Sequence, residues 1–223
     1  MAAGQHTFTV HDSEVLVESP ILGLRRDEVE MPGGKRSYRE IVEHFGAVAI
    51  VAHRKNASTG ASEIAMVKQY RHCVGQRLWE LPAGILDVAH EPELTCAQRE
   101  LEEEAGLAAE SWGVLVDLVT SPGFCEEAVR VFLAEDLREI PRPEATDEEA
   151  DMAFRWMGLD EATAMIFRGE VVNSIAIAGI LSAREVLSGR ATARPVDIPF
   201  EFRPRHLAER RIAQGVEPDM KRI

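Results

Sequence analysis

The acidic stretch CAQRELEEEAGL, residues 96–107, constrains the fold of this chain more than any other segment. Apolar residues in it and just before it recur at intervals of three and four, as on the core-facing side of an amphipathic helix: Leu94, Ala97, Leu101 and Ala105. Pro92 suits the first helical position, and Gly106 suits a left-handed C-cap. The sequence therefore predicts a helix that begins near Pro92 and ends at Gly106.

Four glutamates crowd the last turns of this predicted helix, where they repel one another and oppose the helix dipole: Glu100, Glu102, Glu103 and Glu104. At about 100° per residue, Glu103 and Glu104 lie within about 60° of Glu100, whereas Glu102 lies on the opposite side. Three carboxylates on one face form an oxygen-rich site that suits Mg²⁺ or Mn²⁺. Arg99 is placed to pair with Glu103 or Glu102. The alternative interpretation is a solvated acidic face.

The composition limits the partners that this chain can bind. With 25 Lys and Arg against 38 Asp and Glu, the formal charge of the 223 residues is −13, which repels nucleic acid. An anionic small substrate would need metal ions or well-placed arginines. The first residues show no signal peptide, and no apolar run approaches the ~18 residues of a membrane span. We expect a cytoplasmic protein that binds neither nucleic acid nor membrane.

The cysteines indicate no metal or disulfide chemistry. Cys73, Cys96 and Cys125 are widely spaced and form no CxxC pair, so neither a zinc knuckle nor a disulfide framework is indicated. We expect Cys73 and Cys125 to be small buried apolar residues.

The remaining chain alternates between short apolar runs and turns. Residues 5–42 contain two extended stretches and the turn MPGGK, which indicates a small β arm. The apolar runs at 46–53 and 63–71 flank a polar turn and predict a hairpin. Further strands are expected at 37–44, 77–84, 112–123, 128–137 and 154–159, and further helices at 160–170 and 174–189.

This order of strands, helix, strands and helices predicts an α+β fold, an α/β/α sandwich with a mixed sheet, rather than alternating βαβ units. We divide the chain into an N-terminal β arm at 1–42, a main domain at 43–190 and a C-terminal tail at 191–223. The tail carries Arg and Pro without clear periodicity. We expect it to pack on the surface or on a partner subunit.

The predicted helix and the loop before it resemble the Nudix box, G-x5-E-x7-R-E-U-x-E-E-x-G-U, in which U is aliphatic. Eight positions match at the correct spacing: Glu91, Arg99, Glu100, Leu101, Glu103, Glu104, Gly106 and Leu107. One departure is that six residues, not five, separate Gly84 from Glu91, with His90 the last of them. The loop is therefore one residue longer than in the usual pattern.

Four stretches around the box resemble the ADP-ribose pyrophosphatase subfamily of Nudix hydrolases. They are QYRH before the box, WELPAG leading into it, TSPGF after it and EEADM further along the chain. The resemblance implies the Nudix fold, a divalent metal, and hydrolysis of ADP-ribose to AMP and ribose 5-phosphate. It also implies a homodimer in which the N-terminal arm is exchanged between subunits. The alternatives are another substrate, such as GDP-mannose, another nucleotide sugar or an oxidised nucleotide, and a silent Nudix-fold module that binds ADP-ribose.

The resemblance also implies roles for particular residues. Glu100 and Glu104 would be the main metal ligands, with Glu103 assisting and the main-chain carbonyl of Ala83 contributing another oxygen. The general base would be Glu149, with Glu148 as the alternative, although both also fit a solvated acidic loop. The residues expected to contact the substrate are Arg71, Glu80, Ser121, Gly123, Phe124, Arg25 and Arg26. The alternative for Arg71 is a surface strand arginine, for Glu80 a structural salt bridge, and for the loop of Ser121, Gly123 and Phe124 an ordinary turn. With an exchanged arm, Arg25 and Arg26 would make their contacts across the two subunits.

Overall fold

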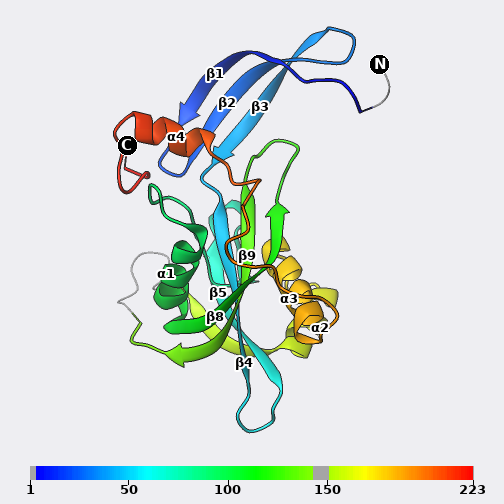
Figure 1. Cartoon of the computed structure of the whole chain (residues 1–223), viewed down its shortest axis with the longest axis vertical. Helices are drawn as coiled ribbons and strands as arrows, with labels where there is room; N and C mark the ends of the chain where they lie inside the picture. The colour runs from blue at the N-terminus through cyan, green and yellow to red at the C-terminus, as the bar shows by residue number, and fades with distance from the viewer. Residues whose placement is uncertain (1–3, 143–150, 223) are drawn as a thin grey trace.

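The computed structural model describes residues 4–142 and 151–222. Its first part is a three-stranded antiparallel sheet of β1 (Val10–Glu18), β2 (Leu22–Glu30) and β3 (Arg36–His44), joined in chain order. This sheet projects from one end of the molecule (Figure 1). The N-terminal β arm expected from the sequence is therefore present.

The second sheet holds seven strands among the described residues, in the order β10-β5-β4-β9-β8, with β6 beside β5 and β7 beside β4. β4 and β9 run parallel and the other pairs run antiparallel, so the sheet is mixed, as predicted. The bounds of the strands are β4 (Ala47–Lys55), β5 (Ser62–Arg71), β6 (Gln76–Glu80), β7 (Ala83–Ile85), β8 (Leu107–Val119), β9 (Ala128–Glu139) and β10 (Ala153–Gly158).

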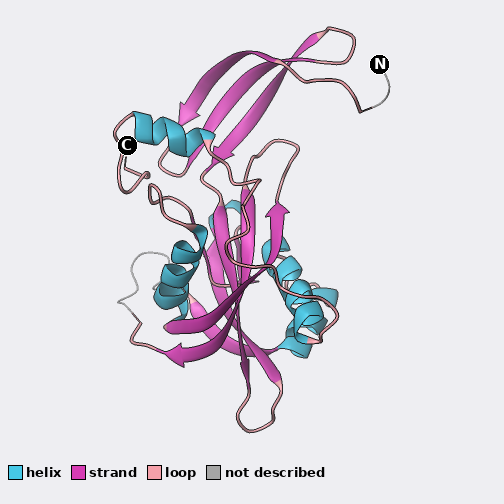
Figure 2. Ribbon diagram, viewed as in Figure 1, coloured by secondary structure: helices cyan, strands magenta, loops and turns pink. Residues whose placement is uncertain are grey.

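Helices cover both faces of the mixed sheet (Figure 2). One face packs against α1 (Glu93–Ala105), and the other packs against α2 (Leu159–Phe167) and α3 (Ser174–Leu187). The fold class predicted from the sequence, an α/β/α sandwich, is confirmed. Within the described chain, no helix is long and apolar enough to cross a membrane.

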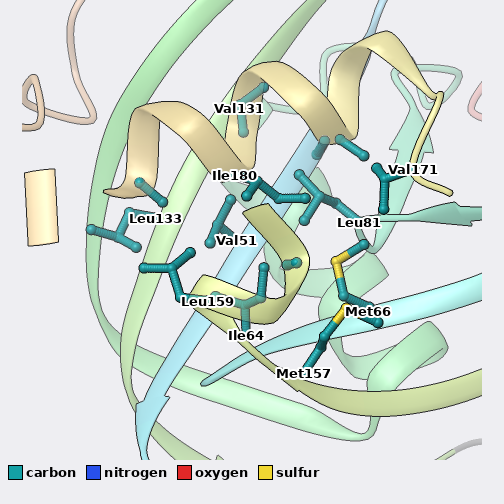
Figure 3. Close-up of a cluster of buried hydrophobic side chains, with 14 of the residues drawn as sticks. Val51, Ile64, Met66, Leu81, Val131, Leu133, Met157, Leu159, Val171 and Ile180 are labelled. Atoms are coloured by element: carbon teal, nitrogen blue, oxygen red, sulfur yellow. The ribbon is translucent and has the colours of Figure 1, made fainter. Parts of the chain in front are cut away.

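Alternation along β4 explains the two layers, because successive side chains of a strand point to opposite faces. Val48 and Ile50 join the core beneath α1, whereas Ala49 and Val51 join the core beneath α2 and α3. Figure 3 shows Val51 in the second core beside Ile180 of α3. A strand that is buried on both faces must be apolar throughout, which is why residues 46–52 lack polar side chains.

Residues 191–222 contain an element that sequence periodicity did not predict, the helix α4 (His206–Ala213). It lies against the arm: Glu43 of β3 is fully buried between Arg25 and Arg210, and Arg211 donates to the carbonyl of Ser19 at 2.7 Å. Gly23 makes room for this contact, since a Cβ there would meet the Glu43 carboxylate. The predicted tail thus packs on the surface of its own chain.

A second contact fixes the same segment to the mixed sheet. Arg130 of β9 is 1% exposed and donates two hydrogen bonds to Asp117 of β8, at 2.8 and 3.0 Å. It also donates to the carbonyls of Ile198 and Pro199, at 2.7 and 3.0 Å. One arginine therefore joins two strands to a segment almost 70 residues further along the chain.

The cysteine expectation is wrong for Cys73, which is exposed in the one-turn 3-10 helix η1 (His72–Val74). Cys125 is half-buried, and only Cys96, on the inner side of α1, is fully buried. A short turn at the end of β5 lies outside the sheet, so none of the residues that the structure describes buries the thiol of Cys73.

Candidate active site

The helix α1 is the centre of the candidate site. Its C-cap Gly106 has φ 64° and its N–H donates to the carbonyls of Glu102 and Leu101, which confirms the left-handed cap. Pro92 is the N-cap rather than the first helical residue, with φ −65° and an extended ψ of 148°, so the helix begins one position later than predicted. Ala97 and Leu101 face the core, and Glu100, which lies between them in the sequence, is directed to the edge of that stripe.

The four glutamates of α1 differ in burial. Glu100 and Glu104 are 8% and 6% exposed, Glu103 is half-buried, and Glu102 is exposed. Glu104 accepts a hydrogen bond from the backbone N–H of Ala83 at 3.0 Å. Two of the three carboxylates predicted to share a face are therefore buried in the protein, and Glu102 is directed to solvent.

A glycine brings the preceding loop onto the helix. A Cβ at Gly84 would overlap Cγ, Cδ and Oε1 of Glu100, so only glycine allows this approach. Gly84 and Ala83 belong to β7, which pairs with β4 in the middle of the sheet. The buried glutamates consequently lie against a strand whose position is fixed by the core.

Arg99 holds three acidic residues together. Its guanidinium donates to Glu91 at 3.2 Å, to Glu100 at 2.6 Å and to Glu103 at 3.1 Å. Of the two partners predicted for Arg99, Glu103 and Glu102, the structure shows the pairing with Glu103. Glu91 was matched to the box by spacing, and the structure shows that it positions Arg99.

Burial raises the pKa of Glu100 to about 7; Arg99 opposes this shift, and the charges of Glu103 and Asp87 add to it. Among the described residues, Arg99 pairs with Glu91, Glu100 and Glu103 of this acidic group. A hard divalent cation would find oxygen donors there. Among the residues that the structure describes, no three histidine, cysteine or acidic side chains converge closely enough to hold a metal ion as they stand. The chemistry of the donors nevertheless suits such an ion, because all are carboxylates near a backbone turn.

Arg71 and Glu80 lie on the sheet face that carries α1. They are joined by hydrogen bonds of 2.7 and 3.1 Å, and Glu80 is buried. Val67 pairs with both Glu80 and Phe154, so these side chains point the same way. The ion pair fits the structural interpretation of Glu80, and a phosphate-binding role for Arg71 stays a prediction. The position of Phe154 beside this ion pair follows from strand pairing and could not be inferred from the local sequence.

The predicted substrate loop turns tightly after β8. The N–H groups of Phe124 and Cys125 both donate to the carbonyl of Ser121, and the loop pairs with β3 through Val42. Gly123 and Phe124 line a cavity of about 530 Å³ whose wall also includes Arg25. Of the described residues, this wall includes none of the box glutamates.

The two arm arginines diverge, as neighbours on a strand must. Arg25 pairs with Asp27 and Glu43 of its own chain. Arg26 is more exposed, pairs with Glu40 at 2.9 Å and lies over the ring of Tyr38. Their expected cross-subunit contacts stay a prediction.

The expected general base lies outside the described residues, since both Glu149 and Glu148 fall within 143–150. Sequence reasoning also missed two groups near the box loop. Asp87 is 4% exposed and pairs with Lys221, and Arg203 donates to the carbonyl of Glu91 at 3.3 Å. No local pattern could reveal them, because their partners are more than 100 residues away in the sequence.

A mixed sheet between helical layers, with a glycine loop packed on buried glutamates, defines a hydrolase of the Nudix class. The NUDIX domain family matches residues 43–175, and the nucleoside diphosphate sugar hydrolase N-terminal domain matches residues 8–42. The chain therefore belongs to the Nudix family. It is a hydrolase, and hydrolases of this family generally use divalent metal ions.

Relatives match over most of the chain. An ADP-ribose pyrophosphatase of Mycobacterium tuberculosis is 55% identical over 93% of this chain and 98% of that protein. An ADP-ribose pyrophosphatase of Bacillus subtilis is 38% identical over 72% of this chain and 84% of that protein. A crystal structure described as an ADP compounds hydrolase matches with a TM-score of 0.70 over 83% of this chain and 97% of that one. At 18% identity, this last match shows the fold alone.

Proposed function

We propose that this protein hydrolyses the pyrophosphate bond of ADP-ribose, with Mg²⁺ or Mn²⁺, to give AMP and ribose 5-phosphate. The observation that carries the proposal is the pair of buried glutamates, Glu100 and Glu104, packed on the loop of Ala83 and Gly84. The 55% identity to an ADP-ribose pyrophosphatase supports the choice of substrate.

In this proposal Glu100, Glu104 and the carbonyl of Ala83 hold the cation, and Glu103 assists. When bound, the cation neutralises phosphate oxygens and lowers the pKa of a bound water. Arg99 keeps the carboxylates in place through its three acidic partners. Arg71 grips the phosphates, since a guanidinium can pair with them through two hydrogen bonds. Glu149, or alternatively Glu148, takes the proton from the attacking water.

The proposed assembly is a homodimer that exchanges the arm of residues 1–42, with 43–190 as the catalytic domain and 191–223 as the appended segment. In support, Arg25 of the arm lines the same cavity as Gly123 and Phe124 of the loop after β8. Phe124 is 60% exposed, so an apolar surface is available to a substrate or a second subunit. A cytoplasmic location stays a prediction that cell fractionation tests.

A substrate panel tests the proposed reaction. AMP release is measured for ADP-ribose and other ADP-sugars. Release of the corresponding nucleoside monophosphate is measured for GDP-mannose and nucleoside triphosphates. Each assay is run with Mg²⁺ and with EDTA. We expect ADP-ribose to turn over fastest and EDTA to abolish the reaction. Faster turnover of GDP-mannose or of a triphosphate would replace the substrate. A wild type that is as inactive as Glu104→Gln but still binds ADP-ribose would favour the silent module.

A further inference from the structure

Residues 218–220 pair with the loop that leads into α1. The N–H of Ala89 donates to the carbonyl of Pro218 at 2.8 Å, and the N–H of Met220 donates to the carbonyl of Asp87 at 2.9 Å. These bonds frame an antiparallel bridge between Val88 and Asp219. Figure 1 shows this end of the described chain beside the loop. The paired stretch lies in the part of the box that is one residue longer than the usual pattern.

An ion pair between a buried carboxylate and a solvent-exposed lysine reinforces this contact. The carboxylate of Asp87 is almost fully buried, and the ammonium of Lys221 pairs with it. Beside the pair, the side chain of Met220 is buried against Phe45 and Leu207. A buried carboxylate that loses its cation is strongly destabilised, because nearby water cannot replace the lost charge.

The loop is in turn packed tightly onto a predicted metal ligand. Asp87 lies three positions after Gly84, and a single Cβ would not fit between that glycine and the carboxylate of Glu100. The charge of Asp87 also acts on Glu100. A shift of the loop would therefore change the position of Glu100 directly.

We propose that Lys221 and Asp87 are positioning residues that fix the box loop, so that Glu100 is held ready for the divalent cation. This inference rests on the proposed function, since the cation site is part of it. Loss of the Lys221 charge leaves Asp87 unpaired, the loop moves to expose that carboxylate, and cation affinity falls. Substitutions of groups that orient metal ligands typically cost about 10–100-fold in metal affinity.

The test uses the full chain and two measurements: Mn²⁺ binding by titration calorimetry, and hydrogen exchange of the Ala89 amide. Lys221→Met is expected to weaken Mn²⁺ binding by about tenfold and to accelerate exchange of Ala89. Lys221→Arg keeps the charge and is expected to behave like the wild type. The double variant with Asp87→Asn and Lys221→Met is expected to recover most of the affinity, because neither side chain is then charged.

Arg222→Met is the matched control, because Arg222 is exposed and its side chain pairs with Asp219 outside the loop. It is expected to leave both measurements unchanged. Equal Mn²⁺ affinities for Lys221→Met and the wild type would overturn the proposal, even if the melting temperature fell. A wild type that binds no Mn²⁺ would contradict the proposed metal site itself. Slow exchange of Ala89 in the wild type and fast exchange in Lys221→Met would still establish the positioning of the loop.

Discussion

Burial and charge conflict at Glu100. Its carboxylate is needed as an anion to bind a cation, yet burial favours the protonated form and raises its pKa to about 7. Arg99 compensates only in part, since it also serves Glu91 and Glu103. A second positive charge nearby would therefore stabilise the ionised form of the Glu100 carboxylate.

This conflict predicts how the stability of the metal-free protein depends on pH. Between about pH 4.5 and pH 7 the folded state holds a proton on Glu100 that the unfolded state has released. The free energy of unfolding should therefore fall as pH rises through this window, by on the order of 3 kcal/mol. Urea denaturation in EDTA at several pH values measures it.

Glu100→Gln should remove this part of the pH dependence, because the amide cannot ionise. Glu102→Gln is the control, since Glu102 is exposed on the far side of the helix. Parallel pH profiles for the wild type and Glu100→Gln would contradict the assignment of the raised pKa to burial of Glu100.

At the scale of elements, the contact between β7 and α1 depends on one glycine. Gly84→Ala should destabilise the fold by about 1–3 kcal/mol, because the added Cβ overlaps Glu100 and must push strand and helix apart. Metal-dependent activity should fall as well. Thermal unfolding and turnover measurements check both effects.

Gly158→Ala is the matched control for this change. Gly158 has a negative φ of −57°, and a Cβ there would come only within 3.8 Å of Glu161. It should leave stability and turnover close to those of the wild type. A Gly84→Ala protein with wild-type stability would show that the loop and the helix can separate freely.

At the scale of the whole molecule, residues 191–222 join the two sheets. Arg130→Met should lower the free energy of unfolding by about 3–5 kcal/mol, because it removes a buried cation from Asp117 and detaches the carbonyls of Ile198 and Pro199. Chemical denaturation measures this loss. Arg190→Met, which breaks an exposed pair with Glu185, should have no measurable effect. Equal effects of the two variants would disprove the structural role of Arg130.

The box and its helix could be predicted because their determinants lie close together in the sequence. The spacing of Leu101 and Gly106 is visible within one segment, as is the grouping of the glutamates. The helix α4 could not be predicted, since it is only eight residues long and its stability comes from contacts with Glu18, Glu43 and Ser19 of the arm. The roles of Arg71, Glu80 and Arg25 stay predictions.

The sequence alone therefore determined the layered fold, the position of the acidic helix and the family, because helical and strand periodicity and the box spacing are local. Only the tertiary structure decided which glutamates are buried, that Arg99 gathers Glu91 with Glu100, and that Lys221 reaches Asp87. Burial and ion pairing depend on which distant segments meet. These tertiary contacts are fixed by packing of the whole chain, so a short stretch of sequence does not encode them.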